Sequence, residues 1–170
     1  MRNLKRMGAT LMALALVLGM NLTAFAAAAD TGFSDVSADA WYADAVAYVR
    51  DNGLMSGTSA AAFDPDGTMT RAMLAQTLYR AAGSPAVSGS DSFTDTAEGA
   101  WYADAVLWAS RQGVISGYGS GLFGTDDPVT REQIAAILWR YAGSPAAEAG
   151  TDFADEADIS AYAAQAVDWA

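Results

Sequence analysis

Two segments within residues 41–85 have the pattern of helices. In the first of them, hydrophobic residues recur with helical spacing. An apolar face at i, i+3, i+4 and i+7 spacing is typical of an amphipathic helix with one buried side. Gly53 follows the first segment directly, and a glycine at this place is typical of a helix C-terminus. The pattern therefore predicts a helix from about Trp41 to Asn52. Its apolar face consists of Tyr42, Ala45, Val46 and Val49.

The second segment opens at Thr70, a residue type that caps helix N-termini. Gly83-Ser84-Pro85 ends this second predicted helix. Between the two helices, residues 54–69 are rich in Gly, Ser, Asp and Pro, so we expect a loop with at most a short extended piece. The apolar face of the second helix consists of Leu74, Ala75, Leu78 and Ala82.

Both segments belong to a repeat of about 60 residues, and chance does not explain so many matches at one spacing. One two-helix unit cannot bury its apolar faces alone, so we expect the copies to pack against one another in a mostly α-helical domain. The matched pairs are Phe33-Ser34-Asp35 with Phe93-Thr94-Asp95, Trp41–Val46 with Trp101–Val106, Gly53 and Gly57 with Gly113 and Gly117, Phe63 with Phe123, Thr70-Arg71 with Thr130-Arg131, and Arg80, Gly83, Ser84 and Pro85 with Arg140, Gly143, Ser144 and Pro145.

The start of the second helix differs between the two copies. In the second copy Thr130 and Gln133 form a capping box, in which the Thr130 hydroxyl accepts from the Gln133 N–H and the Gln133 side chain reaches back. The first copy has Met73 at the place of Gln133. We therefore expect Thr70 to keep its cap and to lose the reciprocal bond.

A third copy begins at Phe153-Ala154-Asp155 and stops inside its first expected helix. Its Ala166-Val167 pair matches Ala105-Val106 but lies one position further along than the repeat spacing requires, so one residue is inserted. The last residues carry neither a cap nor a glycine, and we interpret the third copy as truncated.

The N-terminus has the three parts of a secretory signal peptide. Basic residues in the first six positions precede an apolar run, Met7–Met20, and a small-residue stretch around Ala26–Ala29. The run is shorter than the roughly 18–20 residues that a spanning helix needs, which disfavours a retained membrane anchor. We therefore expect export and cleavage near Ala26–Ala29. The predicted organisation is a signal peptide at 1–28, repeats at 30–90 and 91–150, and a truncated repeat at 151–170.

Removal of the signal peptide leaves six basic residues, all arginine, against 20 acidic ones, a net charge of −14. Such a chain repels nucleic acid and anionic membranes, so neither is an expected partner. The chain has no cysteine and no histidine, which excludes Cys-His and Ser-His-Asp nucleophiles and most zinc sites. With 52% hydrophobic residues it is expected to fold around a core, held by packing without disulfides.

The order Phe-x-Asp, Trp-Tyr-Ala-x-Ala-Val, Gly-x-x-x-Gly, Phe, Thr-Arg and a closing Arg resembles the S-layer homology (SLH) repeat, over about residues 33–170. The resemblance implies a three-lobed pseudo-trimer of repeats with a central helical bundle, here incomplete. It also implies non-covalent anchoring of an exported protein to the cell wall, through secondary cell-wall polysaccharide, commonly pyruvylated, bound in grooves between repeats. The family's Thr-Arg-Ala-Glu is Thr-Arg-Ala-Met at residues 70–73 and Thr-Arg-Glu-Gln at residues 130–133, so both copies keep the arginine and neither keeps the final glutamate.

Residues that suit such a polymer stand at matching places in both copies. An arginine at a helix start offers a planar fork of donors to a carboxylate, beside the positive end of the helix dipole. The tryptophans suit stacking on sugar faces, the loop glycines leave backbone groups free to bond hydroxyls, and the aspartate after each phenylalanine is a further candidate. The candidate polysaccharide-binding residues are Arg71, Arg131, Trp41, Trp101, Gly57, Gly117, Asp35 and Asp95.

Each of these residue types also has a structural interpretation. The arginines would pair with a neighbouring aspartate and tie the repeats together. The tryptophans, and Tyr162 at the same place in the third copy, would pack in the core or between repeats. The aspartates, Asp155 included, would cap or turn the chain after the phenylalanine.

Two other functions fit the sequence poorly. If Gly67 takes position 6 of a calcium-binding loop, Ala62 and Met73 fall at positions 1 and 12, where strong ligands are needed. The acidic residues are repeated or scattered, as on solvated faces, and a two-helix repeat has no room for a substrate cleft, so we expect no catalysis, metal or cofactor within these residues. The expected function is wall anchoring, and the alternative is a structural module that binds other surface-layer proteins.

Overall fold

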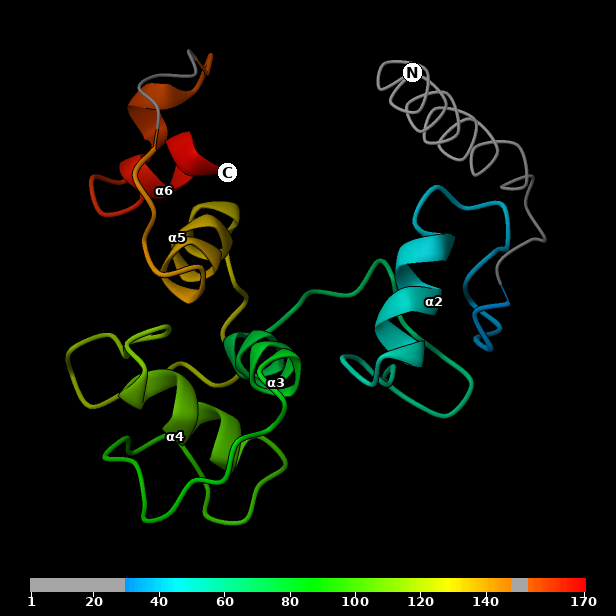
Figure 1. Cartoon of the computed structure of the whole chain (residues 1–170), viewed down its shortest axis with the longest axis horizontal. Coiled ribbons are helices and arrows are strands. Elements are labelled where there is room, and N and C mark those ends of the chain that lie inside the picture. The colour runs from blue at the N-terminus through cyan, green and yellow to red at the C-terminus, as the bar shows by residue number, and fades with distance from the viewer. Residues whose placement is uncertain (1–29, 148–152) are drawn as a thin grey trace, which may run out of the picture.

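The computed structural model describes residues 30–147 and 153–170, so the predicted signal peptide lies outside the described residues. Within these residues every regular element is a helix, and a single isolated bridge joins Thr70 to Pro128. The predicted mostly α-helical class is confirmed. In chain order the elements in Figure 1 are α2 (Ala43–Asp51), α3 (Arg71–Ala81), α4 (Ala103–Arg111), α5 (Arg131–Tyr141), the 3-10 helix η1 (Glu156–Asp158) and α6 (Ala164–Trp169).

The first helix of each full repeat ends where the glycines predict. Gly53 and Gly113 follow α2 and α4 with φ angles of 66° and 68°, a conformation that favours glycine. Their N–H groups donate to the carbonyls of Arg50 and Ser110. The start of α2 lies two residues later than Trp41, because the Trp-Tyr pair forms a turn before the helix.

The second helices are capped as predicted. The Thr70 hydroxyl accepts from the Met73 N–H at 3.3 Å, and α3 has no reciprocal bond. At α5 the Thr130 hydroxyl accepts from the Gln133 N–H at 3.3 Å, and the Gln133 side chain accepts from the Thr130 N–H at 3.4 Å. The capping box that distinguishes the second copy is therefore present.

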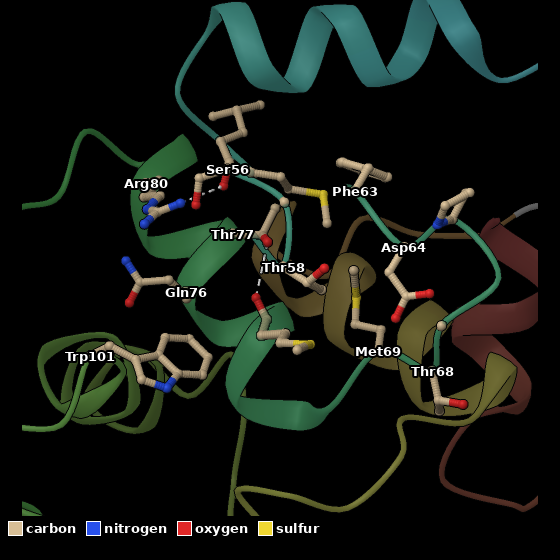
Figure 2. Close-up of a pocket in the computed structure, with 16 residues that line it drawn as sticks. Ser56, Thr58, Phe63, Asp64, Thr68, Met69, Gln76, Thr77, Arg80 and Trp101 are labelled. Atoms are coloured by element: carbon tan, nitrogen blue, oxygen red, sulfur yellow. Dashed lines mark hydrogen bonds between the residues drawn. The ribbon is translucent and has the colours of Figure 1, made fainter. Parts of the chain in front are cut away.

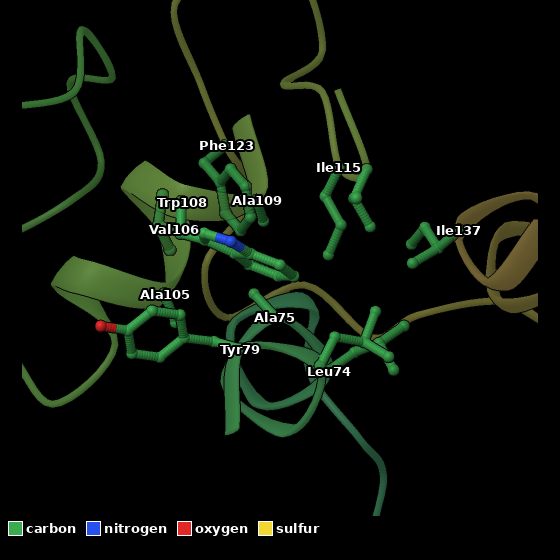
Figure 3. Packing of buried hydrophobic residues seen from close by; sticks show 12 residues of the cluster. Leu74, Ala75, Tyr79, Ala105, Val106, Trp108, Ala109, Ile115, Phe123 and Ile137 are labelled. Atoms are coloured by element: carbon green, nitrogen blue, oxygen red, sulfur yellow. The ribbon is translucent and has the colours of Figure 1, made fainter. Parts of the chain in front are cut away.

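Helices pack between repeats rather than within them. Helix α3 of the first repeat lies against α4 of the second, and α5 of the second repeat lies against α6 of the third, as Figure 1 shows. The expectation that neighbouring copies pack on each other's apolar faces is confirmed, but Ala45 and Ala82, which were expected on these faces, are exposed. Figure 3 shows the core at the first junction, which consists of Leu74, Ala75, Leu78 and Tyr79 from α3, Ala105, Val106, Trp108 and Ala109 from α4, and Val114, Ile115, Phe123 and Ile137.

A separate, smaller core forms in the N-terminal half of the first repeat. The ring of Phe63 lies 5.4 Å from that of Phe33 and covers this core from one side. Within the described residues, no helix packs on α2 as α3 packs on α4. One face of α2 in the first repeat therefore stays uncovered, whereas the corresponding face of α4 in the second repeat is buried against α3. The buried members of the small core are Phe33, Val36, Ala43 and Val46.

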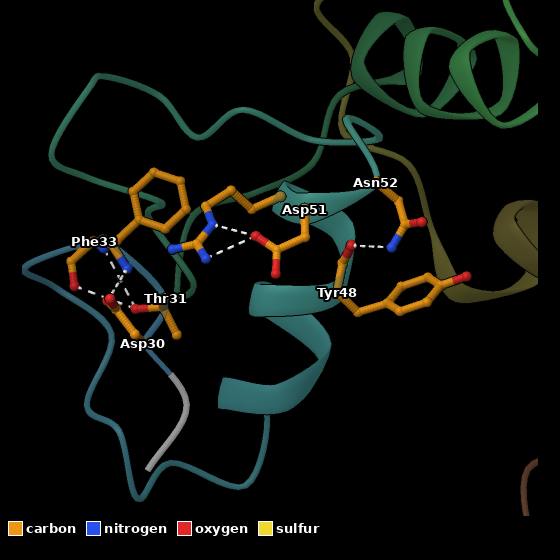
Figure 4. Close-up of polar contacts among 8 residues, drawn as sticks. Asp30, Thr31, Phe33, Tyr48, Asp51 and Asn52 are labelled. Carbon is orange, nitrogen blue, oxygen red and sulfur yellow. Dashed lines mark hydrogen bonds and ion pairs between the residues drawn. The ribbon is translucent and has the colours of Figure 1, made fainter. Parts of the chain in front are cut away.

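Polar contacts around α2 are local, as Figure 4 shows. Arg50 forms an ion pair with the next residue, Asp51, at 2.7 Å, with the Asp51 side chain exposed and the Arg50 side chain partly exposed. The Asn52 side chain donates to the Tyr48 carbonyl at the end of the helix. Since this is the one ion pair among residues 30–147 and 153–170, the fold depends on packing and on hydrogen bonds to the backbone.

Candidate functional site

The start of α3 lies against the loop of the next repeat, residues 114–129, which we name loop 2. The Arg71 N–H donates to the Asp127 carbonyl at 3.0 Å, and the Ala72 N–H donates to the Thr125 carbonyl at 3.2 Å. The first N–H groups of a helix have no partner within the helix. Loop 2 supplies these partners from outside and so fixes the position of the helix start.

The side chain of Arg71 continues the same contact. Its Nε donates to the Phe123 carbonyl at 2.9 Å, and its Nη2 donates to the Ser116 carbonyl at 2.7 Å. The guanidinium carbon also lies 4.5 Å from the centroid of the Tyr118 ring, a cation–π geometry. Arg71 is only 4% exposed. It ties two repeats together through backbone carbonyls, where the structural interpretation had expected an aspartate.

Asp95 holds loop 2 in the shape that Arg71 needs. Its carboxylate accepts from the N–H groups of Phe123 and Gly124 at 2.7 and 2.6 Å. Burial raises the pKa of Asp95, but the N–H groups of Phe123, Gly124 and Thr125 outweigh burial and bring the pKa below its ordinary value of 3.8. Because the N–H groups of Phe123 and Gly124 are bound to Asp95, the backbone here is fixed with the Phe123 carbonyl directed at Arg71.

The corresponding loop of the first repeat, residues 54–69, is named loop 1. Asp35 holds loop 1 as Asp95 holds loop 2. It accepts from the N–H groups of Phe63 and Asp64 at 2.9 and 2.7 Å. The Phe63 N–H is the main cause of a lowered pKa at Asp35, followed by that of Asp64. Each loop is thus held by an aspartate that lies 28 residues before the phenylalanine it binds. The structural interpretation had instead expected these aspartates to cap or turn the chain directly after Phe33 and Phe93.

The glycines at the bend of each loop are required by close packing. A Cβ on Gly57 would collide with the Ala62 carbonyl and the Phe33 ring. A Cβ on Gly117 would meet the Leu122 carbonyl and the Phe93 ring in the same way. Both glycines also line the grooves described next.

A groove of about 260 Å³, named groove 2, opens where loop 2 meets α5 and the third repeat. Arg71 and Arg140 both line it, so two of the six arginines outside the predicted signal peptide converge on one place. Arg71 is almost fully buried, its Nε and Nη2 donate to carbonyls of loop 2, and its Nη1 has no hydrogen-bond acceptor among the described residues. The groove can bind an anion that also carries hydroxyls. Its other lining residues include Ser116, Gly117, Tyr118, Gln133 and Tyr162.

The corresponding place in the first repeat is a wider groove of about 540 Å³, named groove 1, which is shown in Figure 2. It lies between loop 1 and α3 and is bordered by Trp101. Among the described residues, no arginine lies over loop 1 as Arg71 lies over the Tyr118 ring of loop 2. Five residues of groove 1 have counterparts one repeat later, in loop 2 and α5. The pairs are Ser56 with Ser116, Gly57 with Gly117, Thr58 with Tyr118, Phe63 with Phe123 and Arg80 with Arg140.

Glu132 fastens the third repeat to the start of α5. Its carboxylate accepts from the N–H of Ser160 at 2.9 Å, from the Ser160 hydroxyl at 3.1 Å and from the Tyr162 hydroxyl at 3.0 Å. The Ser160 N–H is the main cause of a lowered pKa at Glu132. Burial, and then the bond to Glu132, raise the pKa of Tyr162. At the junction of the first and second repeats, Ala72 and Trp101 take the places of Glu132 and Tyr162, so the two junctions are fastened by different chemistry.

The structure separates the candidate residues into three groups. Arg71 and Gly117 lie in groove 2, and Gly57 and Trp101 lie in groove 1. Asp35 and Asp95 lie behind the loops and bind their backbone. Arg131 and Trp41 are exposed and line neither groove, and Trp41 is 94% exposed. A role in sugar binding stays a prediction for all eight residues.

Sequence reasoning did not select Tyr118, Glu132 or Arg140. Arg140 was recognisable as the closing arginine that recurs one repeat after Arg80. Tyr118 and Glu132 break the repeat, since the first copy has Thr58 and Ala72 there, so a search for repeated residues passes over them.

Helices that pair across repeat boundaries, with a groove at each junction, define a tandem-repeat module. A model of the S-layer homology domain matches residues 32–73 and 92–135, about half of the chain. The chain belongs to the S-layer homology family.

Known relatives include both surface-layer proteins and enzymes. The surface-layer 125 kDa protein of Lysinibacillus sphaericus is 34% identical over 115 residues, which are 65% of this chain and 10% of that protein. The S-layer protein of Bacillus thuringiensis subsp. finitimus is 32% identical over 113 residues, 66% of this chain and 14% of that protein. The endoglucanase of Bacillus sp. (strain KSM-635) is 30% identical over 140 residues, 79% of this chain and 15% of that enzyme. The chain thus spans at most 15% of the length of these three relatives.

These findings establish a coarse function. The matched region is a non-catalytic module of surface attachment, and the protein belongs at the cell surface or cell wall. Among residues 30–147 and 153–170, no helix is both long and apolar enough to cross a membrane. In the same residues no three acidic side chains stand close enough together to hold a metal ion.

Proposed function

We propose that the protein attaches to the bacterial wall by binding secondary cell-wall polysaccharide, of the pyruvylated kind, in groove 2. The observation that carries the proposal is the convergence of Arg71 and Arg140 on this groove. An anionic polymer is repelled by the chain as a whole, so its binding needs a local positive site. Groove 2 is such a site.

The arrangement also suits the neutral parts of a sugar. Tyr118 and Tyr162 line the groove and offer hydroxyl groups and ring faces to a sugar, and Gly117 lines it without a side chain. Because Arg71 is held by Phe123 and Ser116 before any ligand arrives, its guanidinium loses little conformational entropy on binding. Among the described residues, Glu132 is the one carboxylate that is hydrogen-bonded to a side chain lining groove 2, that of Tyr162. Its negative charge would disfavour an anion placed beside it.

Co-sedimentation with purified cell walls tests the proposal, with walls used before and after chemical removal of the secondary polymer. The full-length protein is expected to pellet with intact walls and to stay in solution with stripped walls. Arg140→Gln is expected to weaken binding about tenfold, the order expected for one lost charge-assisted hydrogen bond. Arg50→Gln is the matched control, because it removes the same charge from a solvated ion pair outside both grooves.

Binding that survives removal of the polymer would overturn the proposal. Equal losses in Arg140→Gln and Arg50→Gln would overturn groove 2 as the site, since net charge alone would then explain the effect.

A further inference from the structure

Glu132 lies at the point where the third repeat meets groove 2. It stands in the first turn of α5, and its carboxylate binds the third repeat through Ser160 and Tyr162. Among the described residues that line groove 2, Tyr162 is the one that comes from the third repeat. This wall of the groove therefore depends on how Tyr162 is held.

Tyr162 is held at both ends of its side chain by the same carboxylate. Its hydroxyl donates to one oxygen of Glu132 at 3.0 Å. The N–H of Ser160, two residues earlier, donates to the other oxygen at 2.9 Å, which fixes the backbone from which the ring projects. The ring is 50% exposed, so packing alone does not fix it. Glu132 thus sets the place of this ring in the groove.

The bond to Glu132 also decides what Tyr162 can offer to a ligand. A tyrosine hydroxyl that gives its proton to a carboxylate can only accept from a further group. Tyr162 therefore suits a sugar hydroxyl and disfavours an acid group. Burial and then Glu132 raise the pKa of Tyr162, and the charge of Arg140 lies close enough to act in the opposite direction. An acceptor for hydroxyls and a donor for acid groups hence stand at neighbouring places in groove 2.

We propose that Glu132 is a positioning residue for polysaccharide binding in groove 2. It holds Tyr162 as the acceptor for a hydroxyl of the bound sugar, while Arg71 and Arg140 attract the acid group. The two kinds of partner then orient the sugar in the groove. Glu132 itself acts without touching the polymer, and its role rests on the function proposed above.

The charge and the hydrogen bonds of Glu132 act on binding in opposite directions. Its charge repels an anion, but three donors and the positive end of the α5 dipole offset that charge. Removal of a screened charge at a solvated rim would tighten binding by no more than about twofold. Loss of the charge-assisted bond to Tyr162 would weaken binding about fivefold. Positioning therefore outweighs repulsion, and the sign of the change distinguishes the two.

Co-sedimentation of the full-length protein with purified cell walls tests the positioning role. Glu132→Gln keeps the size of the side chain and removes its charge, and it is expected to weaken binding about fivefold. A purely repulsive Glu132 would give tighter binding in this variant. In the Tyr162→Phe background Glu132 has no ring hydroxyl to hold, so Glu132→Gln is expected to cause no further weakening.

Ser160→Ala is the matched control for a loosened third repeat. It removes the other hydroxyl that binds Glu132, at 3.1 Å, and leaves the Tyr162 bond and the groove lining in place. It is expected to change binding less than twofold. A loss as large as that of Glu132→Gln would overturn the positioning role, because general loosening would then account for both. So would a fivefold loss from Glu132→Gln in the Tyr162→Phe background.

Walls stripped of the secondary polymer separate this role from the proposed function. Parent protein that pellets equally with stripped walls overturns the function itself, and the role of Glu132 with it. If the parent protein and Arg140→Gln behave as proposed but Glu132→Gln binds as tightly as the parent or tighter, only the positioning of Tyr162 is overturned.

Discussion

Loop 1 and loop 2 have the same length and share most of their backbone hydrogen bonds, yet they differ in burial. An aspartate holds each one, and a pair of phenylalanine rings stands 5.4 Å apart at loop 1 and 5.3 Å apart at loop 2. Phe123 is fully buried, whereas Phe63 is half-buried. The difference comes from α3, whose start covers loop 2. The shape of each loop is therefore set locally, and its burial is supplied by the preceding repeat.

The arginines of the two helix starts show the same dependence from the donor side. Arg71 is buried because loop 2 lies in front of it, and Arg131 is exposed because no described loop lies in front of α5. Both follow a capping threonine and begin a helix of eleven residues. The same local sequence thus gives a buried arginine that binds loop 2 at α3 and an exposed arginine at α5.

The largest effect is expected in the cores beneath the two loops. Phe123→Ala leaves a cavity in place of a side chain with no exposed surface and is expected to lower the free energy of unfolding by about 3–5 kcal/mol. Phe63→Ala removes a half-buried ring and is expected to cost about half as much. Urea denaturation followed by Trp fluorescence measures both. Equal costs would show that loop 1 is covered in solution as completely as loop 2.

The next effect separates the two arginines. Arg71→Ala removes two charge-assisted hydrogen bonds and uncovers two carbonyls of loop 2, so it is expected to cost about 3 kcal/mol of unfolding free energy. Arg131→Ala in dilute protein is expected to change stability by less than about 0.5 kcal/mol, because no described group loses a partner. If Arg131→Ala proves as costly as Arg71→Ala, the chain makes a contact at α5 that the structure does not contain.

The helices and their ends were predictable from the sequence because they depend on local chemistry. Thr70 and Thr130 cap whatever helix follows them, and Gly53 and Gly113 take a left-handed conformation at low cost. The constant repeat spacing also predicted that the repeats pack on one another. Each of these inferences needs only neighbouring residues or a count along the chain.

The division of roles among the candidate residues was not predictable in the same way. Trp41 and Trp101 have the same sequence neighbours, but Trp101 borders groove 1 because α3 lies beside it. Among the described residues no helix precedes Trp41, which is almost fully exposed. The partners of Arg71 are backbone carbonyls, which every sequence supplies and no sequence pattern marks. Residues that act across a junction therefore need the arrangement of repeats before a role can be assigned.

A smaller effect is expected at the ring beneath Arg71. Tyr118→Leu keeps an apolar side chain and removes the ring face 4.5 Å from the guanidinium, so it is expected to cost about 1 kcal/mol of unfolding free energy. In the Arg71→Ala background the same change is expected to cost almost nothing. The double-mutant cycle in urea isolates the pair. Identical costs in both backgrounds would assign the role of Tyr118 to packing instead.

The smallest effect compares the two aspartates by pH. The pKa values of Asp95 and Asp35 are lowered in the folded protein, so each stabilises the fold fully above the ordinary value of 3.8 and loses this contribution as the pH falls below it. Asp95→Asn is expected to lower Tm by roughly 4 °C at pH 7, with the gap to the parent protein closing below pH 3.8. Asp35→Asn is expected to follow the same course with a smaller amplitude, because loop 1 is solvated and its N–H groups can bind water instead. Thermal unfolding by circular dichroism between pH 7 and pH 3 measures both, and a gap that stays constant with pH would show that the carboxylate charge is not what holds these loops.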